Sequence, residues 1–159
     1  MFWWLSFTAI LLAAAFTAFL LARPLARRRR DSRMQQAQRE FGYQRERLEA
    51  KFLDCAAATG KPRGLRWVEC QWDRKPVFVK DRNQNKLAAF VGVTIRFQAI
   101  EGGGMEDVPA VKNLRTATGV FHYEDGRWIT IGKTLFNLEP RQAVARFKDQ
   151  FEPLATSPT

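Results

Sequence analysis

The feature that most constrains this chain is an uncharged run at its start. Residues 2–22 contain no charged side chain, no Pro and no Gly, and their only polar residues are Ser6, Thr8 and Thr17. A helix of this length spans about 31 Å, the hydrocarbon thickness of a bilayer. Core helices of soluble proteins are rarely apolar on every side over such a length. The run therefore predicts a membrane-spanning helix, whose large apolar side chains are Phe2, Trp3, Trp4, Leu11, Leu12, Phe16, Phe19, Leu20 and Leu21.

Arginines follow this run at once, and they predict the direction of insertion. Six of them occur within residues 23–33: Arg23, Arg27, Arg28, Arg29, Arg30 and Arg33. Positive flanks stay on the cytoplasmic side of a span, so we expect the N-terminus outside, the C-terminal side in the cytoplasm, and a location at the cell membrane. The competing interpretation, a cleaved signal peptide, would have its positive charge before the apolar run. The arginines should also attract anionic lipid headgroups, with about 1 kcal/mol per charge.

The remainder of the chain has the length of one compact domain. Residues 31–60 favour a single helix, in which Met34, Phe41, Leu48 and Cys55 recur every seven residues. The polar residues Gln44 and Lys51 interrupt this apolar repeat, so the helix is poorly suited to form a coiled coil by itself. Phe52 and Ala56 predict that the last two turns pack on a sheet. We expect five segments: a span (1–22), a basic juxtamembrane segment (23–33), a helical stalk (34–60), a small domain (61–153) and a tail (154–159).

From residue 65 the apolar pattern changes to alternation, which is typical of strands. Residues 65–73 and 75–81 form two short runs, and Pro76 predicts a bend or an edge position. Residues 87–99 alternate most clearly, with the odd-numbered side chains predicted to face the core.

Residues 113–136 predict a hairpin around Asp125-Gly126, because both residues tolerate positive φ. This turn pairs Glu124 with Arg127, Tyr123 with Trp128, His122 with Ile129 and Phe121 with Thr130. Residues 137–154 then predict a helix, with Asn137 as its cap, Pro140 in its first turn and a buried stripe of Val144, Phe147 and Phe151.

The element order therefore predicts an α+β fold, with about five antiparallel strands and helices on one face of the sheet. In outline this order resembles the cystatin-like and nuclear transport factor 2-like proteins, in which a curved sheet wraps a helix. The resemblance concerns the order of elements alone, and it implies a fold rather than a function.

Few residues suggest chemistry. His122 is the only histidine, which excludes a site with several histidines, and Cys55 and Cys70 belong to no C-x-x-C pair. The stretch EGGGMEDVP (101–109) is glycine-rich but lacks the Lys and Ser/Thr of a phosphate-binding loop, and its carboxylates would repel an anion. We therefore predict no catalytic residues, no metal site and no cofactor. The expected function is a non-catalytic interaction or scaffold module.

The partners expected are the membrane and a protein, which includes a second copy of the chain. Two alternatives stay open. A small molecule could occupy an apolar cleft lined by aromatic side chains: Trp67, Trp72, Trp128, Phe78, Phe90 and Phe97. Anionic lipid or RNA could bind the basic residues of 61–96, although no RNA-binding signature is present and nucleic acid is not the expected partner. The principal residues of that basic surface are Lys61, Arg63, Arg66, Arg74, Lys75, Lys80 and Arg82.

Overall fold

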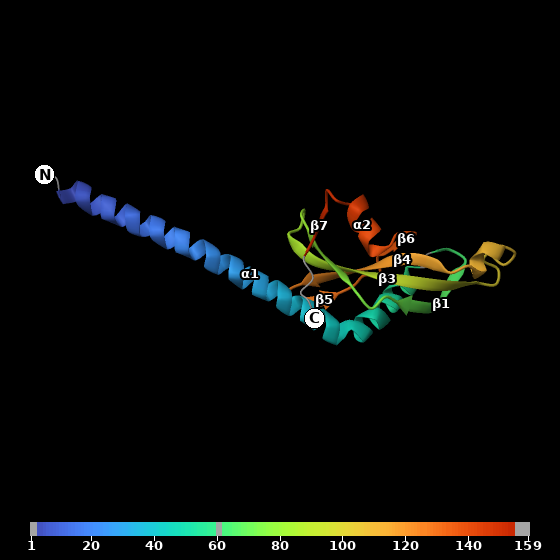
Figure 1. The fold of residues 1–159 in the computed structure, drawn as a ribbon. Coiled ribbons are helices and arrows are strands. Elements are labelled where there is room, and N and C mark those ends of the chain that lie inside the picture. Colours follow the sequence, from blue (N-terminus) through green and yellow to red (C-terminus); the bar gives the residue numbers. More distant parts are fainter. Residues whose placement is uncertain (1–2, 60–61, 155–159) are drawn as a thin grey trace. The chain divides into compact units, whose positions relative to one another are not determined.

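The computed structural model describes residues 3–59 and 62–154, except for the side chains of residues 4–30 (Figure 1). The chain forms two compact units, residues 1–36 and residues 37–159. Its elements are α1 (Trp3–Ala58), β1 (Leu65–Trp72), β2 (Val77–Asp81), β3 (Lys86–Ala99), the short 3-10 helix η1 (Pro109–Lys112), β4 (Arg115–Glu124), β5 (Arg127–Ile129), β6 (Thr134–Phe136), α2 (Pro140–Arg146) and β7 (Phe151–Pro153).

The first unit, over its described residues 3–36, is the beginning of helix α1. The predicted span (1–22) and the arginines at 23–30 lie outside the residues whose side chains are described, except for Trp3, which is exposed. Among the side chains that are described, at positions 3, 31–59 and 62–154, no helix combines the length and the apolar character needed to cross a bilayer.

The second unit is built on a seven-stranded antiparallel sheet, so the α+β class is confirmed. Its order is β5-β4-β3-β2-β7. Strand β1 also pairs with β3, and β6 also pairs with β4. Strands β1 and β2 lie along the same side of β3, opposite residues 93–99 and 86–90 respectively. The chain bends between them at residues 73–76, as Pro76 predicts.

The prediction of about five strands is wrong in number. The last predicted strand divides into β5 and β6, because the chain leaves the ladder at residues 130–133. Gly132 has φ = +72° there, and a Cβ at this position would lie 2.8 Å from Ala56 Cα of α1. The close approach of the two backbones breaks the strand.

The prediction of helices on one face is also wrong (Figure 1). The odd-numbered residues of β3 pack against α1 and define the α1 face, where Leu87, Ala89 and Val91 meet Phe41 and Phe52. The even-numbered residues Ala88 and Phe90 are equally buried, but they pack with Ala143 of α2 and with Phe151 on the opposite side, the α2 face. The continuous apolar stretch LAAFV in β3 is the reason, since such a stretch suits a strand covered on both sides.

Helix α1 packs on the sheet over a longer stretch than the two turns predicted. Ala37, Phe41, Leu48, Phe52 and Ala56 are all at most 4% exposed. From the first of these to the last, the helix rises about 30 Å. At the start of this stretch the Trp128 indole Nε1 donates to the Ala37 carbonyl over 2.8 Å.

The β4–β5 hairpin has the predicted register for three pairs: Glu124 with Arg127, Tyr123 with Trp128, and His122 with Ile129. The fourth predicted pair, Phe121 with Thr130, is not part of this ladder. Instead the Thr130 hydroxyl donates to the Val120 carbonyl over 3.2 Å.

The last predicted helix is shorter than expected. It spans Pro140–Arg146, and Glu139 rather than Asn137 occupies the N-cap, where its N–H donates to Gln142 Oε1. Asn137 has φ = +57° and lies before the helix. Phe151 is buried as predicted, but on strand β7, which pairs with β2.

Candidate functional site

The aromatic side chains proposed to line a cleft on the sheet mostly form the core. Trp128, Phe78, Phe90 and Phe97 are at most 6% exposed, whereas Trp67 and Trp72 are partly buried. On the α1 face, Phe41 packs edge to face on the Trp128 ring, with centroids 4.8 Å apart. Phe52 does the same with Trp72 at 5.1 Å. On the α1 face, the aromatic rings of the sheet therefore pack against the aromatic rings of helix α1.

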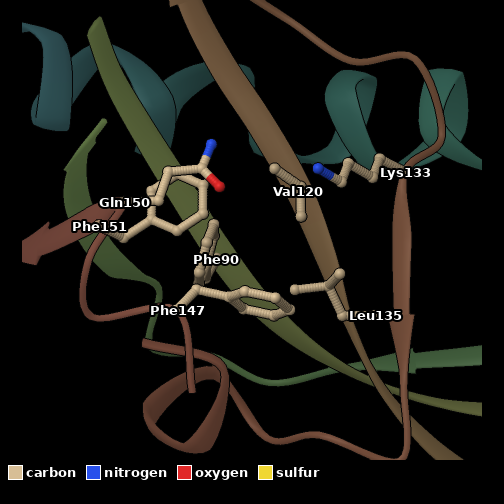
Figure 2. A pocket seen from close by; sticks show the side chains of 7 residues that line it. All are labelled: Phe90, Val120, Lys133, Leu135, Phe147, Gln150 and Phe151. Atoms are coloured by element: carbon tan, nitrogen blue, oxygen red, sulfur yellow. The ribbon is translucent and has the colours of Figure 1, made fainter. Parts of the chain in front are cut away.

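A small hollow lies on the other face, between the sheet and the segment from α2 to β7 (Figure 2). Five apolar side chains and two polar ones line it: Phe90, Val120, Leu135, Phe147, Phe151, Lys133 and Gln150. Its free volume is about 30 Å³. That is room for about two water molecules, far below the hundreds of cubic ångströms typical of small-molecule sites.

Asp81, at the end of β2, is a buried carboxylate that is only 4% exposed. Its Oδ1 accepts from the backbone N–H groups of Asn83 and Gln84, at 2.8 and 3.1 Å, and its Oδ2 accepts from Gln150 Nε2 at 2.9 Å. Burial by itself would raise the pKa of Asp81. The hydrogen bonds from Gln150, Gln84 and Asn83, together with nearby His122, outweigh burial and lower that pKa. Asp81 thus closes the β2–β3 turn and ties it to the segment before β7.

Sequence reasoning did not single out Asp81 or Gln150. An Asp followed two residues later by Asn, in a polar stretch between two strands, is the typical pattern of a side chain that caps its own turn. That signal was sufficient to find the turn contacts of Asp81. The contact with Gln150 joins residues 69 positions apart, and no local pattern indicates it.

His122 is half-buried on the α2 face, opposite Ala88 of β3 and Ile129 of β5. Burial lowers the pKa of His122, and Glu124 partly opposes this effect. Cys70 lies opposite Ile95 and packs with the α1-face residues Val93 and Ile95. The sheet therefore separates the Cys70 thiol from His122, which rules out a Cys–His pair between them.

Both cysteines are free thiols, and the surroundings of each are those of a packing residue rather than of a reactive one. Burial, assisted by the charge of Glu69, raises the pKa of Cys70 to about 11. A thiol with that pKa holds almost no thiolate at neutral pH and is a poor nucleophile. Cys55 lies on α1 with its Sγ 3.7 Å from the Thr130 carbonyl oxygen. The contact between Cys55 and Thr130 lies next to the point where Gly132 approaches the backbone of α1.

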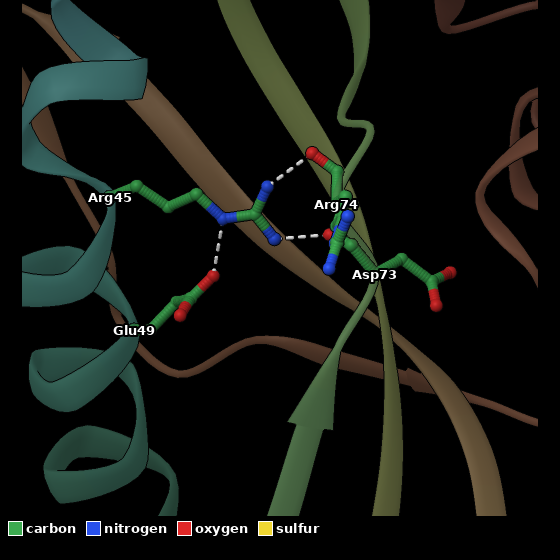
Figure 3. A network of polar contacts seen from close by, with 4 residues as sticks. All are labelled: Arg45, Glu49, Asp73 and Arg74. Atoms are coloured by element: carbon green, nitrogen blue, oxygen red, sulfur yellow. Dashed lines mark hydrogen bonds and ion pairs between the residues drawn. The ribbon is translucent and has the colours of Figure 1, made fainter.

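Arg45 connects helix α1 to the bend between β1 and β2 through hydrogen bonds (Figure 3). Its guanidinium donates to the backbone carbonyls of Asp73 and Arg74, and its Nε lies 2.6 Å from Glu49 Oε1. The Arg45 side chain is 18% exposed; its contact with Glu49 is partly buried, whereas its charge-assisted hydrogen bonds to the two carbonyls lie at the surface. No local sequence pattern predicts the arrangement, because Arg45 and Asp73 are 28 residues apart.

The glycine-rich stretch 101–109 forms an ordered connection between β3 and β4. The Ile100 N–H donates to the Gly64 carbonyl and the Gly103 N–H donates to the Ile100 carbonyl, both over 2.9 Å. Hydrogen bonds from backbone N–H groups, led by that of Glu106 itself, lower the pKa of the Glu106 carboxyl. Gly102, Met105 and Gly103 supply the others. The backbone N–H groups of this loop therefore bind an anionic group, and that group is the Glu106 carboxylate of the loop itself.

Among the basic residues of 61–96, those that the structure describes do not gather on one surface. Arg66 lies on the α2 face opposite Gln98, whereas Lys80 lies on the α1 face opposite Leu87. Arg74 and Lys75 occupy the β1–β2 bend, Arg82 lies in the next turn, Arg63 precedes β1, and Lys61 falls outside the described residues. Several already have partners: Arg66 donates to Gln98, Arg82 pairs with Glu152, Lys86 with Glu124, and Arg96 with Glu69.

Within the described residues, no group of three or more His, Cys, Asp and Glu side chains is arranged to hold a metal ion. Comparison of the chain with protein-family models, curated proteins and solved structures finds no match.

Proposed function

We propose that this chain is a single-pass membrane protein that presents a non-catalytic interaction module on the cytoplasmic side. The observation that carries the proposal is the uncharged run of residues 2–22, followed directly by six arginines in residues 23–33. Such a run has the length of a span, and the arginines resist transfer across the membrane. The folded unit beginning at Ala37 would then lie close to the cytoplasmic surface.

The contacts of the folded unit support an interaction role rather than catalysis. The side chains of this unit that are chemically most reactive contribute to the fold: Asp81 closes a turn, Arg45 holds the β1–β2 bend, and Cys70 packs, partly buried, against the core. The proposed partner is a protein, either a different chain or a second copy. Small residues at Ala14, Ala18 and Ala22 repeat every four positions, a spacing that favours close approach of two membrane helices.

Alkaline washing of membranes tests the anchor. We expect the full chain to stay in the membrane fraction, because a spanning helix resists extraction. Replacing both Leu11 and Leu12 with Arg should release it, since each charge at a helix centre costs about 3 kcal/mol. The matched control changes the same two residues to Ala and should remain membrane-bound. Release of the unaltered chain would overturn the proposal.

Cysteine labelling tests the orientation. In a background with Cys55→Ala and Cys70→Ala, one variant carries a Cys inserted directly after Met1 and another carries Thr159→Cys. An impermeant maleimide added to intact cells should label the first variant only, and the second should react after permeabilisation. The opposite pattern would contradict the predicted topology.

Photo-crosslinking in membranes tests the interaction role. A crosslinker at Val68, which is 54% exposed on β1, should trap a partner or a second copy. The same sample kept without ultraviolet light is the control and should give no crosslinked product. If crosslinkers at Val68, Tyr43 and Ile131, all exposed, give no product, the unit is not an interaction module under those conditions.

A second candidate function is the binding of a small apolar ligand, and the hollow between the sheet and the segment that follows α2 is the observation that favours it. The hollow is open to solvent on one side, but it would enclose a small molecule only if the segment between α2 and β7 moved outward. Replacing Leu135 with Trp should fill the hollow and abolish binding of an apolar fluorescent probe. If the unaltered chain binds no such probe, this candidate fails.

A further inference from the structure

We draw no further inference here: the strongest candidate, the outer edge of strand β1 with Val68 exposed at its bulge, pairs with no other strand in the part of the chain that the structure describes, and nothing in the structure shows what covers it.

Discussion

The two faces of the sheet are both buried, but they are closed by different means. On the α1 face, about twenty residues of one helix lie across the strands, and aromatic rings pack against one another along its length. On the α2 face, a seven-residue helix and the residues that directly follow it cover a smaller apolar cluster, and polar groups at Asp81, His122 and Gln150 lie beside it.

The difference shows where the stability of the fold resides. A long helix with many ring contacts removes more apolar surface from water than a short one. Hydrogen bonds, each contributing about 1 kcal/mol net, occur on both faces, so the difference in buried apolar surface decides the comparison. We therefore expect substitutions on the α1 face to cost more free energy of unfolding than equivalent ones on the α2 face.

The largest expected effect is that of Phe52→Ala on the α1 face. Phe52 is fully buried and contacts the rings of Trp67, Trp72 and Phe121, so its loss should lower the free energy of unfolding by about 3–5 kcal/mol. The matched change on the α2 face, Phe147→Ala, should cost about 1–2 kcal/mol because Phe147 is only partly buried. Urea unfolding followed by tryptophan fluorescence measures both values. Equal costs would contradict the proposed difference between the faces.

Gly132→Ala should have the next largest effect, about 3 kcal/mol. Its Cβ would press on the backbone of α1 near Ala56, and its φ of +72° adds strain. The control is Gly126→Ala, where φ is +77° but no atom lies within 4 Å of the new Cβ. That control should cost only about 1 kcal/mol, from backbone strain alone. If the two variants unfold at the same urea concentration, the contact of α1 with residues 130–133 is not tight.

Asp81→Asn measures how much the hydrogen bonds of Asp81 contribute to stability on the α2 face. It keeps the shape of the side chain but weakens the hydrogen bonds to the turn and to Gln150, and it should cost about 1–2 kcal/mol. The pKa of Asp81 is lower in the folded chain than its ordinary value. Its stabilising contribution is therefore present above the ordinary pKa of a carboxyl group, and it is lost as the pH falls through the lowered, folded-state pKa. In Asp81→Asn, this part of the acid sensitivity should be absent from unfolding curves measured between about pH 5 and pH 2.

The smallest effect concerns His122. Burial lowers the pKa of this side chain, so the folded state favours the neutral imidazole. The free energy of unfolding should consequently fall as the pH drops from about 7 to about 5, because the unfolded chain takes up the proton first. An NMR titration of the single histidine should give a pKa below the ordinary value. A pKa above it would show that the acidic neighbours Asp81 and Glu124 outweigh burial.

The local parts of this fold were predictable from the sequence. Asp125-Gly126 specifies a two-residue turn, and that turn determines which residues of β4 and β5 face each other. The alternation in residues 87–99 identifies β3 and its α1 face, because side chains of a strand point alternately to its two sides. The same stretch also carried the signal for burial on both faces, in Ala88 and Phe90, and the prediction of helices on one face overlooked it.

The candidate site was much less predictable. The hydrogen bond of Gln150 to Asp81 and the contacts of Arg45 with the β1–β2 bend join residues far apart in the chain. Such pairs depend on how the elements pack, and neither residue type is unusual at its position. Strand β7 was missed for a related reason. Residues 151–153 have a helix-like apolar spacing with the preceding residues, but their pairing with β2 decides their conformation.

By itself, the sequence determined an apolar segment of bilayer length, the arginines that follow it, the class of the fold and the hairpin register. These properties depend on composition, on periodicity and on turns of two residues, all of which act over short stretches of chain. Only the tertiary structure decided that α1 covers one face from Ala37 to Ala56, that α2 closes the other, and that the sheet separates Cys70 from His122. Those outcomes depend on which apolar surfaces pack against each other and exclude water. This packing involves all elements of the folded unit at once.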